Sequence, residues 1–180
     1  MKWLVVGLGN PEGKYFDTWH NVGFRAVEML CSSEFKTKRG QNYLMAENND
    51  TVFIKPLTYM NRSGEAVAAV SRKGKIPINN IIVLTDDLHI DKGKIKVVRG
   101  GSHAGHNGIR SINDIMQDNA YIKIRIGIKP EKDVDIKKYV LTKVDSPIAI
   151  EEAVIATRMI IQGENLLNVQ SKFNTKNDSM

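Results

Sequence analysis

The chain has 180 residues, of which 42% are hydrophobic and 26% charged, a balance that excludes a disordered, collagen-like or disulfide-stapled chain. It carries 26 Lys and Arg against 20 Asp and Glu, and this net charge of +6 suits either an ordinary lysine-rich surface or a polyanionic partner such as RNA. One cysteine, Cys31, allows no internal disulfide, and no apolar run approaches the ~18 residues of a membrane helix, so we expect a cytoplasmic protein.

The first third of the chain predicts a strand, a helix and a hairpin. Residues 3–8 form a continuous apolar run that ends in Gly-Leu-Gly-Asn-Pro, which is typical of a buried strand entering a turn. Apolar residues three and four positions apart predict a helix over residues 21–32. Residues 41–47 and 51–55 predict two strands that are joined by a turn at Asn48-Asn49-Asp50.

The middle of the chain alternates between the two kinds of element. A segment rich in Ala and Val predicts a helix over residues 64–73. Apolar runs predict a buried strand over 80–84 and another strand over 94–98. A glycine-rich loop, 100–108, then opens a helix, and alternating side chains predict a strand over 121–128.

The last part of the chain is predicted to be helical, over residues 134–140, 147–162 and 164–173, with a frayed tail at 174–180. Strands that alternate with helices predict one α/β domain over residues 1–180. Its sheet would be twisted, mixed but mostly parallel, with helices on both faces. In such sheets ligands bind beyond the carboxyl ends of the strands, so the polar clusters that follow strands would share one rim.

The first of these clusters is Gly7-Leu8-Gly9-Asn10-Pro11. It partly matches the Gly-x-Gly-x-x-Gly fingerprint of dinucleotide-binding proteins. Glu12 stands where the third glycine belongs, and its charge would repel a pyrophosphate. We therefore interpret the glycines as turn residues, which leaves Asn10 free for a role in a site.

His20 opens the helix predicted over residues 21–32. A neutral imidazole with an ordinary pKa of about 6.5 suits general-base catalysis. It needs a carboxylate to fix its tautomer, and Asp86 or Asp87, at the end of the strand 80–84, is the candidate.

Three other features allow two interpretations each. The backbone N–H groups of the loop 100–108 can bind an anion, or the loop can be a flexible surface segment. Its histidines, His103 and His106, together with His89, suggest a zinc site as an alternative function. Asn61 can cap the following helix or polarise a carbonyl group.

Five motifs follow one another between residue 3 and about residue 173: Gly7-Leu8-Gly9-Asn10-Pro11 with Tyr15, Thr18, His20-Asn21 and Gly23; Pro56-Leu57-Thr58-Tyr59-Met60-Asn61-Arg62-Ser63-Gly64; Asp86-Asp87-Leu88; Gly100-Gly101-Ser102 with Gly105-His106-Asn107-Gly108; and Arg125-Ile126-Gly127-Ile128. In this order and at this spacing they resemble the motifs of the bacterial peptidyl-tRNA hydrolases. The chain departs from the usual family pattern at Glu12, Trp19, His89 and Asp91, and Trp19 removes a positive charge next to His20.

The resemblance implies a hydrolase that cleaves the ester between a peptide and the 3′ end of tRNA, with no cofactor and no metal. In this family His20 would be the general base that activates water, Asp86 would orient its ring, and Asn10 would engage the peptide. The tRNA terminus and the substrate would be contacted by Tyr15, Tyr59, Asn61 and Asn107. The expected partner is the acceptor stem and 3′ end of peptidyl-tRNA. We expect no membrane, no obligate protein partner and a monomeric state.

The basic excess would serve the same substrate. We expect contacts to phosphates and 2′-hydroxyls from the basic residues of one span, namely Lys94, Lys96, Arg99, Arg110, Lys123, Arg125 and Lys129. Two alternatives stay open: an RNA-binding protein of the same fold without activity, and a metal-dependent hydrolase that uses His89, His103 and His106.

Overall fold

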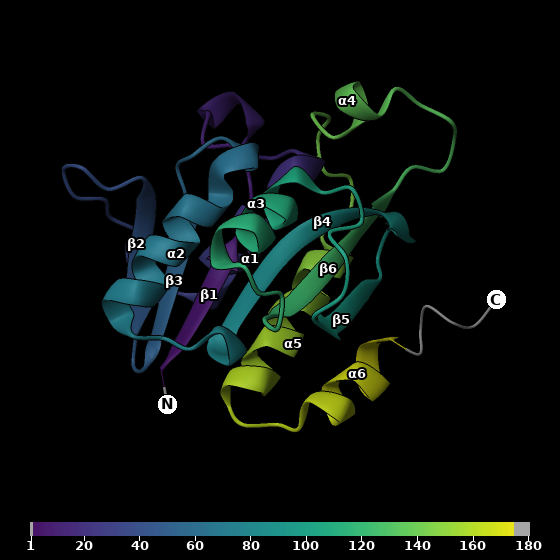
Figure 1. The fold of residues 1–180 in the computed structure, drawn as a ribbon. Coiled ribbons are helices and arrows are strands. Elements are labelled where there is room, and N and C mark those ends of the chain that lie inside the picture. The colour runs from purple at the N-terminus through teal and green to yellow at the C-terminus, as the bar shows by residue number, and fades with distance from the viewer. Residues whose placement is uncertain (1, 175–180) are drawn as a thin grey trace.

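The computed structural model describes residues 2–174, which are built around one six-stranded sheet (Figure 1). The strands are β1 (Trp3–Gly7), β2 (Tyr43–Asn48), β3 (Thr51–Pro56), β4 (Ile81–Asp91), β5 (Ile95–Arg99) and β6 (Ile122–Lys129). Their order across the sheet is β2-β3-β1-β4-β6-β5. The four inner strands are parallel, whereas β2 and β5 at the two edges are antiparallel to their neighbours. The predicted mixed, mostly parallel sheet is thus confirmed.

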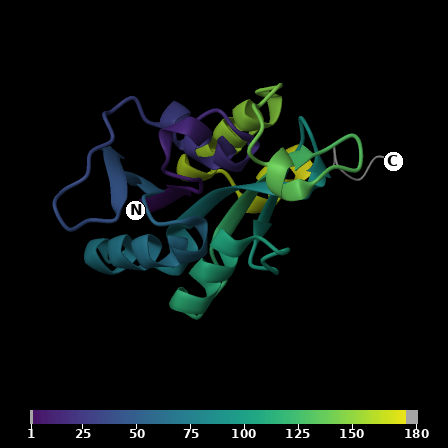
Figure 2. The ribbon, with the colours of Figure 1, turned by 90° about the horizontal axis from the view of Figure 1, so that it is seen from above.

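Helices cover both faces of this sheet, as Figure 2 shows from above. One face carries α1 (Val22–Leu30), α5 (Ile148–Ile161) and α6 (Leu166–Asn174), and the other carries α2 (Ser63–Gly74) and α3 (Asn107–Met116). The short α4 (Ile136–Tyr139) stands above one end of the strands (Figure 1). Within residues 2–174, no helix combines the length and the apolar character that crossing a bilayer requires.

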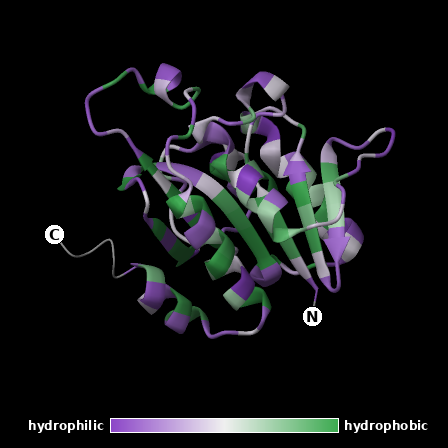
Figure 3. Ribbon diagram, turned by 180° about the vertical axis from the view of Figure 1, so that it is seen from behind, coloured by the Kyte–Doolittle hydropathy of each residue, from purple (hydrophilic) through white to green (hydrophobic). Residues whose placement is uncertain are grey.

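Strand β1 and the first part of β4 are apolar because both of their faces are covered (Figure 3). Side chains alternate across a strand, so Val5 joins the core under α1 and α5, whereas Leu4 and Val6 join the core under α2 and α3. All three of these side chains have no exposed surface.

The fourth strand is longer than its sequence pattern predicts. The prediction ends it at Leu84, but β4 continues to Asp91, and Asp86 pairs in register with Ile126 of β6. Polar residues after an apolar run are typical of a strand end. Here they stay in the strand because side chains from other elements satisfy them, so Asp86 lies inside β4 and not after it.

The C-terminal helices lie close to their predicted positions. The segment predicted as helix over residues 134–140 forms only the four-residue α4. Asn174 ends α6, and its side chain accepts a hydrogen bond from the backbone N–H of Val97 and donates one to its carbonyl. The rest of the predicted frayed tail, residues 175–180, lies outside the described residues.

A close backbone contact places α1 against the centre of the sheet. A Cβ atom on Gly23, in the first turn of α1, would lie 2.4 Å from the carbonyl oxygen of Leu84 in β4. It would also lie 2.6 Å from the carbonyl oxygen of Leu8. Only glycine permits this approach. Because His20 lies two residues before the start of α1 and Asp86 follows Leu84 by two residues, the contact brings His20 and Asp86 together.

Gly23→Ala is therefore expected to destabilise the fold by about 1–3 kcal/mol, as overpacking does when the neighbouring atoms cannot yield. Both neighbours here are backbone atoms of buried residues, Leu84 inside β4 and Leu8 directly after β1. Urea denaturation measures the change. The matched control is Gly13→Ala, because a Cβ there meets nothing within 4 Å. Equal stability of the two variants would show that the contact is not tight.

Candidate active site

A cavity of about 370 Å³ opens at the end of the strands, below α4. One wall is apolar and includes Leu88, Ile136 and Leu141. The opposite wall is polar and is formed by His20, Asp86, His106 and Asn107. An apolar surface that faces a few convergent polar groups is the usual form of a site for an organic substrate.

His20 and Asp86, which the sequence analysis paired, are in direct contact. Nδ1 of His20 lies 2.8 Å from Oδ2 of Asp86. The carboxylate is 4% exposed and His20 is 23% exposed, so the ring lies between the buried acid and the cavity. The backbone N–H of His20 also donates to the carbonyl of Val140, after α4. Nε2 of His20 has no hydrogen-bond partner among the described residues, and is free to bind a molecule in the cavity.

The other oxygen of Asp86 is bound by a second histidine, which the sequence analysis considered only as a metal ligand. Nε2 of His106 lies 2.7 Å from Oδ1 of Asp86. Nδ1 of the same ring accepts hydrogen bonds from the backbone N–H groups of Gly108 and Ile109, since His106 caps the N-terminus of α3. A nitrogen that accepts carries no proton. The proton of His106 is therefore on Nε2, where it is donated to Asp86.

These contacts determine the protonation of the pair. Burial by itself raises the pKa of Asp86, but the neighbouring His20 and His106 rings outweigh it and hold that pKa well below its usual range. Burial lowers the pKa of His20, and the charge and hydrogen bond of Asp86 outweigh it, so the pKa of His20 is raised above its ordinary value. Asp86 is thus a stable anion whose charge favours a protonated His20.

Asn10 lies outside the lining of the cavity, and its backbone is fixed by Asn21. The buried side chain of Asn21 accepts from the backbone N–H of Asn10 at 2.7 Å and donates to its carbonyl at 2.9 Å. The Asn10 side-chain oxygen accepts from the backbone N–H of Glu12 at 3.0 Å. The amide NH₂ of Asn10 is consequently the part of this side chain that remains available. Asn21 is part of a quoted motif, but its bracing contacts depend on the folded loop and give no separate signal in the sequence.

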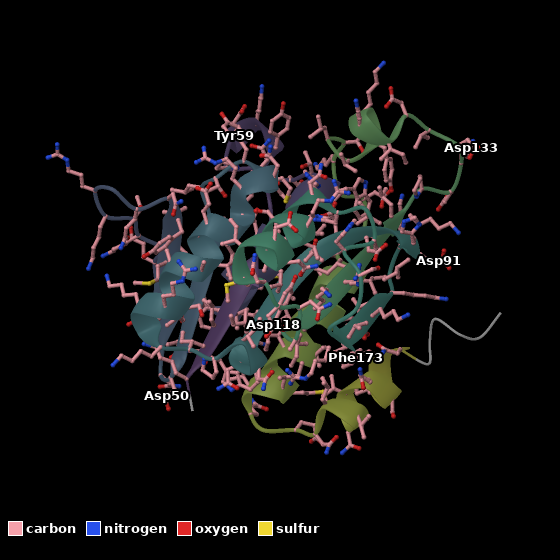
Figure 4. All side chains as sticks on the ribbon, in the orientation of Figure 1. Asp50, Tyr59, Asp91, Asp118, Asp133 and Phe173 are labelled. Carbon is pink, nitrogen blue, oxygen red and sulfur yellow. The ribbon has the colours of Figure 1, made fainter. Side chains whose placement is uncertain are left out.

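The remaining predicted site residues are distributed between the cavity and its surroundings. Asn107 lines the cavity, whereas Tyr15, Tyr59 and Asn61 lie outside its lining. Tyr59 is 61% exposed and stands at the same end of the sheet as α4 (Figure 4). Of the predicted site residues, His20, Asp86 and Asn107 thus line one cavity, and the others lie outside its lining.

The predicted basic surface needs a correction at two positions. Lys123 has no exposed surface and Arg125 is 7% exposed. Arg125 donates to the carboxylate of Asp87 at 3.2 Å, and both cations bind backbone carbonyls of the glycine-rich loop. The alternation of residues 121–128 predicts a half-exposed strand, but the loop after β5 covers this part of the sheet. Lys123 is therefore a buried structural cation, whereas Arg125 reaches the lining of the cavity while its guanidinium binds Asp87 and Ser102.

The predicted alternative metal site does not assemble. Among the described residues, the group that could hold an ion consists of His20, Asp86 and His106, so His89 and His103 take no part. The donor atoms of two ligands that bind one tetrahedral zinc ion lie roughly 3.4 Å apart. Here both histidine nitrogens are within 2.8 Å of the carboxylate oxygens, which is hydrogen-bond spacing. The three side chains as arranged do not fit a metal ion.

Comparison with known proteins places this geometry in a family. The family model described as peptidyl-tRNA hydrolase matches residues 4–180. The chain belongs to the peptidyl-tRNA hydrolase family. It is 39% identical to a peptidyl-tRNA hydrolase of Ureaplasma parvum, with 96% of this chain and 99% of the relative covered. It is also 39% identical to one from Aster yellows witches'-broom phytoplasma, with 79% of each chain covered.

The structural comparison agrees with the sequence comparison. The crystal structure of peptidyl-tRNA hydrolase from Acinetobacter baumannii matches with a TM-score of 0.83 and 30% identity, covering 94% of this chain and 93% of that one. Membership in the peptidyl-tRNA hydrolase family makes the chain an enzyme. The alternative of an RNA-binding protein without activity is thereby disfavoured.

Asp86→Asn should lower the pKa of His20 by at least about one pH unit, because the charge that raises it is lost while the burial that lowers it remains. Titration of the His20 ring by NMR measures this. Asp87→Asn is the control, since Asp87 pairs with Arg125 and does not contact His20. A larger effect from Asp87→Asn would mean that the wrong carboxylate has been assigned to His20.

Proposed function

We propose that this peptidyl-tRNA hydrolase cleaves the ester between a peptide and the 3′ end of tRNA, with His20 as the general base. The observation that supports this most directly is the contact of His20 with Asp86. The buried carboxylate occupies Nδ1, so Nε2 is the nitrogen that is left for a water molecule. The family match supports the substrate class, and this geometry supports the choice of base.

The proposed reaction has two proton transfers. Nε2 of His20 takes a proton from water while the water oxygen attacks the ester carbonyl carbon, and Asp86 stabilises the imidazolium that forms. The ester bond then breaks, and the imidazolium gives its proton to the departing 3′ oxygen. The products are a tRNA 3′-hydroxyl and a peptide carboxylic acid, which loses its remaining proton to solvent and becomes the carboxylate. Such a base contributes about 10²–10⁴ in rate, which is sufficient for an activated ester.

We assign Asn10 to the peptide next to the ester. Its carbonyl oxygen is engaged by Glu12, so its NH₂ group can donate to an amide carbonyl of the substrate. Asn107, which lines the cavity, would provide a second polar contact. Neither amide carries a charge, so neither repels the phosphates of the nearby RNA.

The outer residues would receive the end of the tRNA. An exposed tyrosine such as Tyr59 presents a flat face on which a single-stranded base can stack, and Tyr15 and Asn61 would extend this contact. Phosphates of the acceptor stem would bind exposed cations near the rim, such as Lys129, and Lys137 of α4. The enzyme would act as a cytoplasmic monomer, without a cofactor or metal.

His20→Ala should lower kcat at least 100-fold, since it removes the whole contribution of the base. The affinity for tRNA should stay within about threefold, because binding depends on groups outside the ring. Single-turnover hydrolysis of an N-acetyl-aminoacyl-tRNA measures the first quantity, and filter binding measures the second.

The matched control is His89→Ala, because His89 is exposed and does not line the cavity. It should leave both quantities unchanged. If His20→Ala kept more than a tenth of the wild-type kcat, His20 would not be the base.

Asn10→Ala should narrow the preference for N-blocked over unblocked aminoacyl-tRNA. A blocked substrate offers an amide carbonyl to the Asn10 donor, whereas a free ammonium would face another donor without a partner. The ratio of kcat/KM for the two substrates is the measurement. An unchanged ratio would assign the selectivity to another residue.

A further inference from the structure

The loop between β5 and α3 has to cross the sheet from one end to the other. Strand β5 ends at Arg99, which pairs with Ile122 at the start of β6 and so lies at the end away from the cavity. His106 must return to Asp86, which is level with Ile126 of β6. Four strand residues span about 13 Å. Residues 100–105 therefore run that distance along β6, from the start of the strand toward the cavity.

Two cations of β6 bind the carbonyls of this climbing loop in order. The ammonium of Lys123 donates to the carbonyl oxygens of Gly100 and Gly101, the latter at 3.1 Å. Arg125, two residues further up the same face, donates to the carbonyl of Ser102 at 2.5 Å. Three consecutive carbonyls are thus bound before the chain reaches His106.

The loop itself does little to define its own path. Gly100, Gly101 and Gly105 have φ values of 71°, 83° and 78°, and Ala104 has a φ of 49°. Glycines retain many conformations in the absence of other contacts. The bound carbonyls therefore select the conformation that carries His106 to the carboxylate of Asp86.

Lys123 can hold the loop, but it cannot contact a substrate in the cavity. It has no exposed surface and does not line the cavity. Among the described residues it has no carboxylate partner, and its Nζ lies 5.1 Å from the centroid of the Tyr121 ring. Burial and the charge of Arg125 lower its pKa to about 8. A buried ammonium is costly unless it is hydrogen-bonded, and the loop carbonyls supply those bonds.

We propose that Lys123 is a positioning residue for hydrolysis, which acts by holding the carbonyls of Gly100 and Gly101 so that His106 binds Asp86. This step rests on the proposed function of the His20–Asp86 pair. Without Lys123, the loop samples other paths, His106 leaves the carboxylate, and Asp86 no longer has one defined orientation toward His20.

The test compares Lys123→Met with the wild type, because methionine keeps most of the side-chain volume and has no donor. The His106 Nε2–H proton is followed by NMR on protein labelled at histidine with ¹⁵N, and kcat and KM are measured on N-acetyl-aminoacyl-tRNA. We expect that proton to exchange with water at least 10-fold faster, kcat to fall about 10-fold and KM to change less than threefold. Lys123→Arg, which keeps a cation and donors, should retain most of the slow exchange of the His106 proton and most of the wild-type kcat.

The matched control is Lys73→Met, which removes the same charge from an exposed position of α2 that does not line the cavity, and which should change nothing. Lys123→Gln serves as a second variant should the methionine variant not fold, because its shorter amide can satisfy only one of the two carbonyls. It should give a partial loss of the protection of the His106 proton and a partial loss of kcat. Its near-ultraviolet circular dichroism, which reports the fold, should be unchanged.

Two results would overturn the proposal. One is a folded Lys123→Met or Lys123→Gln protein that keeps both the protected His106 proton and the wild-type kcat. The other is a kcat that falls only as much as the folded fraction of the variant falls, while the His106 proton of the folded protein exchanges as slowly as in the wild type. A different pair of results would contradict the proposed function: a protected His106 proton in the wild type, together with an unchanged kcat in His20→Ala. The NMR comparison of the Lys123 variants would still test the role of Lys123.

Discussion

The carboxylate of Asp86 is buried in the wall of the cavity, and each of its two oxygens is bound by a different histidine. His20 takes one oxygen at 2.8 Å and His106 takes the other at 2.7 Å. A buried carboxylate with only one partner would be costly and free to rotate, whereas this one is charged and fixed. The position of His20 at the cavity depends on that fixation.

Much of the fold serves to deliver these three side chains to one place. The glycine contact between α1 and the sheet brings His20 over β4, since a larger residue at Gly23 would hold the helix away. The unusual length of β4 keeps Asp86 in a strand, which defines its direction. The glycine-rich loop returns the chain from the far end of β5 and places His106 at the N-terminus of α3.

The apolar pattern of the chain was sufficient to predict the sheet, because β1 and the first part of β4 form short continuous apolar runs and β6 shows alternating side chains. The motifs that resemble the family were sufficient to pair His20 with Asp86. The length of β4 was not predictable from local pattern, because Asp86 and Asp87 remain in the strand only through partners distant in sequence. Lys123 was placed on the surface for the same reason, since no local signal indicates that a loop covers it.

The tautomer of His106 illustrates what only the folded structure provides. A His-x-x-His pattern in a glycine-rich loop suggests metal ligands, and nothing in the sequence shows that one nitrogen will cap a helix. Once the two N–H groups at the start of α3 occupy Nδ1, the other nitrogen must donate, and an acceptor such as Asp86 has to face it. The ring of His106 thus both caps α3 and orients Asp86.

The most direct test of this account is to compare two pKa values of the wild-type protein. The acid limb of kcat/KM for N-acetyl-aminoacyl-tRNA reports the ionisation of the essential base in the free enzyme. NMR titration reports the ionisation of His20 itself. The account predicts that the two values coincide and lie above the ordinary histidine value of about 6.5, because Asp86 raises the pKa of His20. An acid limb that differs clearly from the NMR value of His20 would show that another group is the base.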